Sequence, residues 1–243
     1  MSPFLLEMKV KKYLDYNMRT DGLGLLDVNQ MFYELFQRKD YEWWGEVKQD
    51  DVVVDLGACV GFFTCHAIDQ GAKKIYSVEA NRDHLRTLCY NVSDHWIDHE
   101  TSPVVPIHAA IGKDDRYSLN YFGENVQAPR MSFKELIDKY QIPWIDYLKI
   151  DIEGAEFDIF QPENLQYLKH HVGHIACEFH LDAFRESPYE WIHFRDNMCQ
   201  EFDLSKIHFL RHEDHNLAHD DEKILSEWPL GWGGSFMLYI TNS

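Results

Sequence analysis

Four side chains capable of acid–base chemistry end two apolar stretches in the second half of the sequence. Asp151 and Glu153 follow the first stretch, and Glu178 and His180 end the second. Apolar stretches with polar carboxyl ends are typical of strands in an open α/β sheet, whose ligand crevice forms at those ends. Carboxylates and imidazole act as general bases, and imidazole titrates near neutrality. The four residues are therefore candidate catalytic groups.

Two chemistries are compatible with this group. Glu178 and His180 alternate along one strand and share a face, where Glu178 would orient His180 as a general base. Alternatively, Asp151, Glu178 and His180 offer the oxygen and imidazole ligands that Mg²⁺ or Mn²⁺ accepts. The sequence leaves base and metal open. It also leaves open simpler roles, a structural histidine at 180 and helix N-caps at 151 and 153.

A glycine-containing turn in the first half of the chain indicates a second set of functional residues. Residues 51–64, DVVVDLGACVGFFT, contain a β-branched run, then Asp55, Gly57 and Gly61, then the apolar start of an expected helix. A buried strand, a tight turn and a helix form the first half of a nucleotide-binding βαβ unit. Glycine is needed in such a turn because the ligand and the helix both approach the backbone closely.

The spacing of this turn discriminates between cofactors. A dinucleotide loop has the pattern G-x-G-x-x-G around a pyrophosphate, whereas this turn is D-x-G-x-x-x-G, with Cys59 where the middle glycine would stand. No Walker Lys-Ser/Thr pair follows, so a phosphate cradle is poorly supported. Asp55 at the strand end suits a ligand with a positive charge. We therefore expect S-adenosylmethionine, which carries an ammonium and a sulfonium but no phosphate; a plain strand-to-helix turn is the alternative.

Glu79 follows the next expected strand, 74–78. It lies about twenty residues beyond the glycines, where a nucleotide-binding acid holds the ribose hydroxyls. Alternatively, Glu79 starts the helix expected at 81–92, because an acid suits the helix dipole. The third expected strand, 104–111, ends without an acid, so adenine there would be held by apolar and backbone contacts.

Composition and charge narrow the class of protein. The 243 residues are 45% hydrophobic, enough for one sizeable α/β domain with a cap. A net charge of -18 repels nucleic acid and anionic membranes. The sequence contains no apolar run of membrane-spanning length, no recognisable signal peptide and no C-x-x-C pair among its five cysteines. We expect a cytoplasmic protein whose partner is a small-molecule or glycan acceptor; the oligomeric state stays open.

Seven apolar stretches are expected strands, most of them separated by helical spacing. They are residues 52–54, 74–78, 104–111, 145–150, 174–180, 206–210 and 235–241. Five βα units and a final strand pair favour an α/β, Rossmann-like, seven-stranded and mostly parallel sheet whose last strand is antiparallel. Residues 51–243 would form this domain. Residues 1–50 contain two helical patterns and would form an N-terminal helical cap. The capping box Ser132 to Glu135 predicts the start of a helix. Residues 113–130 are expected to form a hairpin or a mobile loop.

Two other clusters admit more than one interpretation. The aromatic residues Tyr41, Trp43 and Trp44 either pack the cap onto the domain or line a substrate pocket. The histidines within His212–His219 have a spacing that could serve a metal, but such polar runs are more typical of a solvated loop.

Four sequence blocks, in this order, resemble the FkbM-type S-adenosylmethionine-dependent methyltransferases. They are VVVDLGACVGFFT, YSVEAN, DYLKIDIEGAE and IACEF, within residues 50–180. The resemblance implies a class I methyltransferase domain that methylates mainly hydroxyl oxygens of sugars, polyketides and related metabolites. The family usually has asparagine where this chain has Cys59. Asparagine tolerates left-handed backbone angles better, so either Cys59 adopts ordinary angles or the loop carries mild strain.

The motifs and the resemblance together imply a cofactor site and an activity. The expected cofactor contacts are Asp55, Gly57, Ala58, Cys59, Gly61, Phe62, Thr64, Glu79, Ala80, Asn81, Ala110, Ile111 and Asp151. Asp151 would also adjoin the methionine end of the cofactor, where it contacts the ammonium or the acceptor. The expected activity is methyl transfer to a hydroxyl group. An aminopropyltransferase using decarboxylated S-adenosylmethionine and a catalytically silent binding module are the alternatives.

Overall fold

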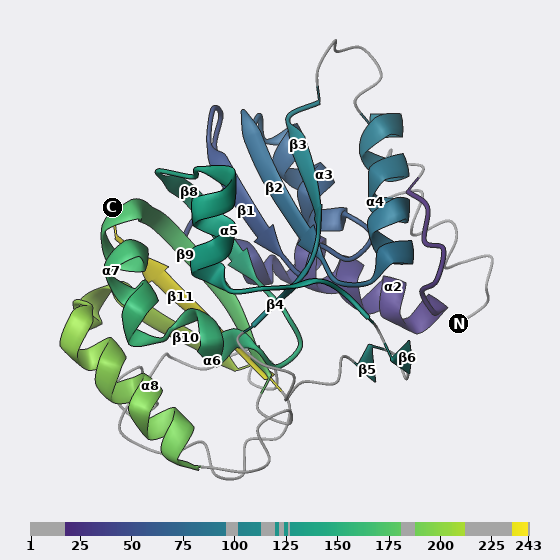
Figure 1. Ribbon diagram of the computed structural model, residues 1–243. Helices are drawn as coiled ribbons and strands as arrows, with labels where there is room; N and C mark the ends of the chain where they lie inside the picture. Colours follow the sequence, from purple (N-terminus) through teal and green to yellow (C-terminus); the bar gives the residue numbers. More distant parts are fainter. Residues whose placement is uncertain are drawn as a thin grey trace.

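A seven-stranded sheet forms the centre of the computed structural model, which describes residues 18–95, 102–112, 120–121, 124–125, 127–180, 188–211 and 235–242 (Figure 1). Its strands are β1 (Val52–Leu56), β2 (Lys74–Glu79), β3 (Val104–His108), β8 (Ile145–Ile150), β9 (Val172–His180), β10 (Ile207–Arg211) and β11 (Ser235–Thr241). The order across the sheet is β10-β11-β9-β8-β1-β2-β3. Within this sheet β11 runs antiparallel to both of its neighbours and the other pairs are parallel. The predicted α/β sheet with an antiparallel last strand is confirmed.

The strand order creates one switch point in the sheet. The chain starts at β1, moves outward through β2 to β3, and then returns to β8 on the other side of β1. Connections on the two sides of this point leave in opposite directions, so a crevice opens at the carboxyl ends of β1 and β8. Gly57 and Gly61 follow β1, and Asp151 and Glu153 follow β8.

Helices cover both faces of the sheet (Figure 1). Those described are α2 (Leu25–Phe32), α3 (Phe62–Asp69), α4 (Arg82–His95), α5 (Phe133–Tyr140), α6 (Glu156–Ile159), α7 (Pro162–His171) and α8 (Pro188–Glu201). Alternate strand residues enter opposite cores: Val54 and Leu148 pack with α5, α7 and α8, whereas Val53 and Tyr147 pack with α2, α3 and α4. Within the described ranges, every helix is too short or too polar to cross a lipid bilayer.

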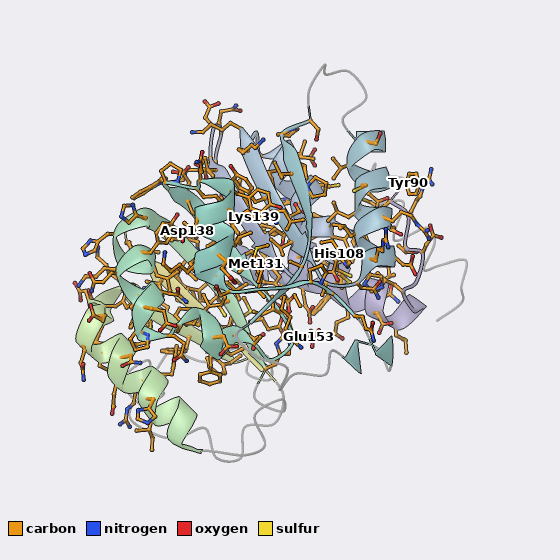
Figure 2. The ribbon with its side chains drawn as sticks, in the orientation of Figure 1. Tyr90, His108, Met131, Asp138, Lys139 and Glu153 are labelled. Atoms are coloured by element: carbon orange, nitrogen blue, oxygen red, sulfur yellow. The ribbon has the colours of Figure 1, made fainter. Side chains whose placement is uncertain are left out.

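The third strand is shorter than the sequence predicts. The expectation of one strand over 104–111 is wrong: β3 ends at His108, and Ala110–Ile111 (β4) pairs instead with Arg130–Met131 (β7). The chain leaves the sheet after His108 because β2 ends at Glu79, so β3 has no partner residue beyond that pair. His108, labelled with Met131 in Figure 2, lies with Nε2 3.0 Å from the Ala80 carbonyl and fixes this departure. Strands β5 (Asn120–Tyr121) and β6 (Glu124–Asn125) pair antiparallel, as expected of a hairpin.

Two local predictions concern helices. The capping box at the start of α5 is confirmed: the Glu135 amide donates to Ser132 Oγ and the Ser132 amide donates to the Glu135 carboxylate. Helix α2 ends in a π-helical segment, η1 (Tyr33–Arg38), followed by the short 3-10 helix η2 (Asp40–Glu42). The other helical pattern of the predicted cap, before residue 18, and the His212–His219 cluster lie outside the described residues.

The segment 32–44 is fastened to the sheet by aromatic contacts. Phe32 packs edge-on against Phe62 at 4.6 Å between ring centroids. The buried hydroxyls of Tyr147 and Tyr239 donate to the backbone carbonyls of Tyr41 and Asp40. Of the three aromatics at 41, 43 and 44, Trp44 stacks on His208 and Trp43 is half exposed. Both tryptophans thus lie away from the cavity described below, and only the tyrosine of this trio reaches it.

His174 is a buried histidine whose ring nitrogens both lack hydrogen-bond partners. Burial, followed by the positive charge of Lys48, lowers the pKa of His174 from 6.5 to about 4. In the unfolded chain the ring binds a proton more readily, so between these pH values the unfolded state is favoured as pH falls. Such a displacement corresponds to about 3 kcal/mol of unfolding free energy once pH is below both values.

We expect His174→Phe to remove this acid sensitivity. Urea unfolding at pH 7.5 and pH 4.5 should give a smaller loss of unfolding free energy for the variant than for the unsubstituted chain, by up to about 2 kcal/mol. His170→Phe, at an exposed position of α7, is the control and should keep the original pH dependence. An unchanged pH dependence in His174→Phe would contradict the prediction.

Candidate active site

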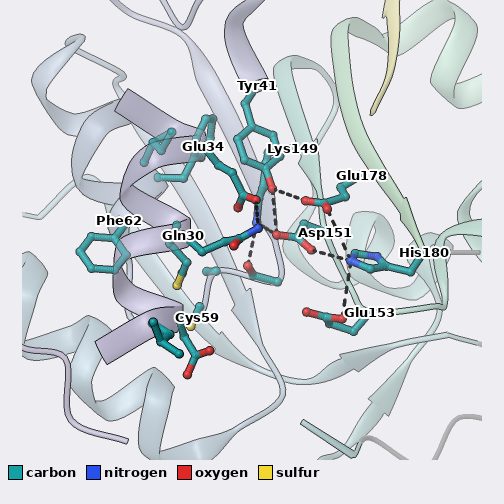
Figure 3. A pocket seen from close by; sticks show the side chains of 17 residues that line it. Gln30, Glu34, Tyr41, Cys59, Phe62, Lys149, Asp151, Glu153, Glu178 and His180 are labelled. Carbon is teal, nitrogen blue, oxygen red and sulfur yellow. Dashed lines mark hydrogen bonds and ion pairs between the residues drawn. The ribbon is translucent and has the colours of Figure 1, made fainter. Parts of the chain in front are cut away.

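A cavity of about 320 Å³ lies at the carboxyl ends of β1, β8 and β9 (Figure 3). One wall comes from α2, η1 and the tyrosine at 41, the floor from the β1–α3 loop, and the other wall from β8 and β9. The residues that line it are Leu26, Asp27, Gln30, Met31, Glu34, Leu35, Tyr41, Gly57, Ala58, Cys59, Phe62, Phe63, Lys149, Asp151, Glu153, Glu178 and His180. The structure therefore gathers the four predicted catalytic residues around one space.

Gly57 makes the floor of this cavity possible. Its φ is +78°, and a Cβ atom built there would lie 1.6 Å from the Asp151 carbonyl oxygen. The amides of Gly57 and Ala58 both donate to the Val78 carbonyl at 3.0 Å, which holds the loop against β2. No side chain fits between β1 and β8 at this position, so the loop requires glycine.

Cys59 adopts the less favourable of the two conformations considered from the sequence. Its φ is +48°, in the left-handed region that costs an ordinary residue about 1–2 kcal/mol. Its amide donates to Glu79 Oε2 at 2.8 Å, and its sulfur lies 3.8 Å from His84 Nδ1. The mildly strained loop is therefore held in shape from the end of β2.

Glu79 has a structural role in addition to the one predicted. Its second carboxylate oxygen accepts from the Asn81 amide at 2.6 Å. Burial raises the pKa of Glu79 to about 7, although the two amides oppose the shift. The Asn81 side chain, rather than Glu79, accepts from the first amides of α4, at Asp83 and His84. Holding the ribose stays a prediction for Glu79.

A smaller hollow of about 30 Å³ adjoins the main cavity through Gly57 and Asp151. It is lined by Gly57, Val78, Glu79, Ala80, Ala109, Ala110, Ile111, Asp151 and Ile152. Its walls are mostly apolar, with two acids, Glu79 and Asp151, of which Asp151 also lines the main cavity. The volume corresponds to about one water molecule, so a purine would have to widen it.

Four of the predicted cofactor residues line neither space: Asp55, Gly61, Thr64 and Asn81. Asp55 is fully buried and accepts from Thr64 Oγ1 at 2.7 Å. The positive group beside Asp55 is Lys149, whose Nζ lies 3.5 Å from Asp55 Oδ1.

Lys149 connects the strand ends. Its side chain is 4% exposed, its ammonium donates to the Gly57 carbonyl at 2.8 Å, and it lies 3.3 Å from Asp151 Oδ2. Burial opposes its charge, but Asp151 and Asp55 outweigh burial and raise the pKa of Lys149. Burial opposes the charge of Asp151, but Lys149, His180 and the hydrogen bond from Tyr41 together outweigh burial and lower the pKa of that carboxyl.

Tyr41 joins the helical wall to the acids of the sheet. Its hydroxyl lies 2.9 Å from Asp151 Oδ2 and 3.1 Å from Glu178 Oε2, and it donates to this pair of carboxylates (Figure 3). Burial, and then the charges of Asp151 and Glu178, raise the pKa of Tyr41 well above its ordinary value. The tyrosine therefore stays protonated and donates.

His180 is charged in this environment. Its Nδ1 lies 3.0 Å from Glu156 Oε1, and its Nε2 lies 3.6 Å from Glu153, 3.7 Å from Glu178 and 3.9 Å from Asp151. Burial opposes the charge, but Glu156 and the other carboxylates outweigh it and raise the pKa of His180 to about 11. The expectation that His180 titrates near neutrality is wrong here, and Glu156 orients the ring more closely than Glu178.

The same side chains are the group that the sequence put forward for a metal. Asp151, Glu178 and His180 each offer one ligand atom, and these atoms lie within 4.8 Å of one another. A ligating imidazole must be neutral, whereas the carboxylates around His180 favour its protonated form. Its present contacts form an ion-pair network.

Comparison with known proteins identifies the family. Residues 55–203 match the family model described as the methyltransferase FkbM domain, which covers more than half of the chain. The chain belongs to the FkbM methyltransferase family. No curated protein matches it.

Solved structures similar to this FkbM domain include other methyltransferases. Precorrin-6y C5,15-methyltransferase from Geobacter metallireducens GS-15 is 11% identical, with a TM-score of 0.48 over 94% of this chain and 95% of that one. A human methyltransferase 10 domain containing protein is 9% identical, with a TM-score of 0.48 over 99% and 94%. TrmK from M. capricolum, in complex with S-adenosyl-homocysteine, is 11% identical, with a TM-score of 0.46 over 85% and 67%.

The site of this FkbM-family chain contains residues that the sequence did not single out. They are Gln30, Glu34, Tyr41 in its contact with the acids, Lys149 and Glu156. A signal existed for Lys149, the only basic residue of a mostly apolar strand, and for Glu156, one of a dense run of acids. None existed for Glu34, whose position depends on the packing of η1 over the sheet.

We expect Gly57→Ala to destabilise this FkbM domain by about 3 kcal/mol, because the added methyl group meets the Asp151 carbonyl and the backbone is left-handed. Urea unfolding would measure the change. Gly24→Ala is the control: its φ is -71°, and the new methyl group meets a flexible carboxylate. A loss of less than about 1 kcal/mol in Gly57→Ala would contradict the proposed packing.

Proposed function

We propose that this FkbM methyltransferase uses S-adenosylmethionine to methylate a hydroxyl group of a sugar or small metabolite. The observation that carries the proposal is the cavity at the sheet's switch point, floored by the Gly57 loop and walled by Asp151, Glu153, Glu178 and His180. A net charge of -18 favours a small acceptor over nucleic acid.

The residues around the two connected spaces fit this cofactor. Ala80, Ala110 and Ile111 offer an apolar surface for the adenine, once the smaller hollow widens. Glu79 is one of the two acids beside that hollow, and its carboxylate has further lone pairs for ribose hydroxyls. Asp151, kept ionised by Lys149, would face the ammonium of the methionine end.

S-adenosylmethionine supplies a methyl group on a cationic sulfur: the acceptor oxygen forms the new C–O bond, the C–S bond breaks, and its electron pair stays on sulfur. The acceptor hydroxyl must also lose its proton, because a neutral hydroxyl is a weak nucleophile. Aligning the acceptor against the loop floor is the task of the two cavity walls, and alignment can lower a barrier by about 7–11 kcal/mol.

Glu153 is the residue that we assign to take up the acceptor's proton. The Glu153 side chain is 46% exposed, and its partial burial, followed by the nearby charge of Asp151, raises the pKa of Glu153 to about 7, where a base is most effective. It lies 3.6 Å from His180 Nε2. His180 would remain an imidazolium that holds Glu153 and Asp151 in place, since Glu156 keeps it charged.

We expect Glu153→Gln to lower kcat by about a hundredfold or more. Because Glu153 must be deprotonated to act, kcat/KM of the unsubstituted enzyme should rise with pH through about 7. The residual activity of the variant should not show this rise with pH. Because the pKa of His180 is raised to about 11, His180 contributes no change in kcat/KM near neutral pH.

The control for this measurement is Glu46→Gln, an exposed carboxylate that does not line the cavity. It removes the same charge and should keep both rate and pH profile. A near-normal rate in Glu153→Gln, or a profile that keeps its limb, would exclude Glu153 as the base.

Binding measurements test the function as a whole. Titration calorimetry should detect S-adenosylhomocysteine binding at micromolar concentrations, and Gly57→Ala should weaken it. Failure to bind even at about millimolar ligand would favour a silent binding module. Tighter binding of decarboxylated S-adenosylmethionine than of the carboxylated form would favour aminopropyl transfer, a reading that the methyltransferase family match disfavours.

A further inference from the structure

We infer that the acceptor carries a protonated amine as well as its hydroxyl, and that the amine binds between Glu34 on the helical wall and Glu178 on the sheet wall. The inference rests on the proposed function, because it names the class of acceptor for the same cavity. It depends on four features of the site: the charge of the lining, the partners of its two cations, the position of Glu34 and the apolar remainder.

The lining of the cavity carries an excess of acids. Five carboxyl groups line it, those of Asp27, Glu34, Asp151, Glu153 and Glu178, against two cations, Lys149 and His180. With all seven ionised the lining has a formal charge of minus three; because the pKa values of Glu34 and Glu153 are both about 7, its charge at neutral pH is nearer minus two. S-adenosylmethionine contributes a single net positive charge, from its sulfonium, ammonium and carboxylate, which leaves about minus one beside the acceptor.

The two cations are already paired with acids outside the lining. Lys149 lies 3.5 Å from Asp55, and His180 lies 3.0 Å from Glu156; both of these acids are fully buried beneath the cavity. Their charges therefore offset much of what Lys149 and His180 would give to the cavity. The negative potential that a ligand meets is stronger than the lining alone indicates.

Glu34 supplies the acid of the helical wall. It lies in the π-helical segment η1, where the Gln30 side chain donates to Glu34 Oε1 at 2.7 Å. Arg38 lies 3.6 Å from the same oxygen, but it also pairs with the buried Asp40. Burial, and then the charge of Glu178 on the opposite wall, raise the pKa of Glu34 to about 7. A cation between the two carboxylates would offset both the cost of burying the Glu34 charge and its repulsion from Glu178.

The remainder of the lining indicates an organic cation rather than a bare ion. Leu26, Met31, Leu35, Phe62 and Phe63 contribute apolar surface, and the cavity holds about 320 Å³. This volume matches the lower end of small-molecule sites. A carbon frame would cover these side chains, whereas an inorganic ion would leave them in contact with water.

The test uses two sugars that differ in one charged group. Protein saturated with S-adenosylhomocysteine is titrated at neutral pH with D-glucosamine and with D-glucose. We expect glucosamine to bind at least about tenfold more tightly. Because the amine favours ionised Glu34, its binding should release protons, seen as a heat that varies with the ionisation enthalpy of the buffer.

Two matched variants locate the effect. Glu34→Gln should lower the glucosamine preference to about threefold or less and reduce the proton release, leaving the part that comes from Glu153. Glu46→Gln removes an exposed carboxylate that does not line the cavity and should keep both.

Three results would overturn the inference: no measurable glucosamine binding, equal affinity for the two sugars, or a preference that Glu34→Gln leaves intact. Failure of the proposed function looks different. In that case S-adenosylhomocysteine does not bind, and the two sugars can still be compared in the protein without it.

Discussion

The buried ammonium of Lys149 is the interaction on which the rest of the site depends. It holds the Gly57 carbonyl, compensates Asp55 and Asp151, and lies 5.3 Å from the centre of the Tyr41 ring. Acids at neighbouring strand ends repel one another, and an uncompensated buried charge costs several kcal/mol. One cation at their centre allows the carboxylates to stay ionised a few ångströms apart. The ends of β1 and β8 and the helical wall are thereby joined through one group.

The sheet and the helical wall contribute different parts of the site. The sheet contributes rigid strand ends, with the acids, His180 and the glycine turn. The segment 25–44 contributes the opposite wall, and Tyr41 fixes that wall to the sheet through Asp151 and Glu178. Under the proposed function, chemistry takes place at the strand ends, and contacts with the acceptor are shared with a segment whose own fold is partly irregular.

The sequence was informative where function follows from short-range pattern. Strand β8 occupies the predicted residues, the Ser132 capping box forms, and the catalytic candidates gather because parallel strands must end at one edge. The failures share a different cause. The early end of β3, the charge on His180 and the position of Glu34 all depend on partners distant in the chain. His180, for example, titrates according to Glu156, which lies in a different element.

The π-helical turn of η1 has a consequence for how such an enzyme changes its selectivity. A π-helical turn holds one more residue than an α-helical turn, and each residue of a helix rotates the next by about 100°. Shortening η1 by one position would swing Glu34 off the cavity and bring another side chain into its place, while the strand ends stayed where they are. A single deletion there would therefore remodel the helical wall of the cavity, whereas Asp151, Glu178 and His180 are placed by the sheet.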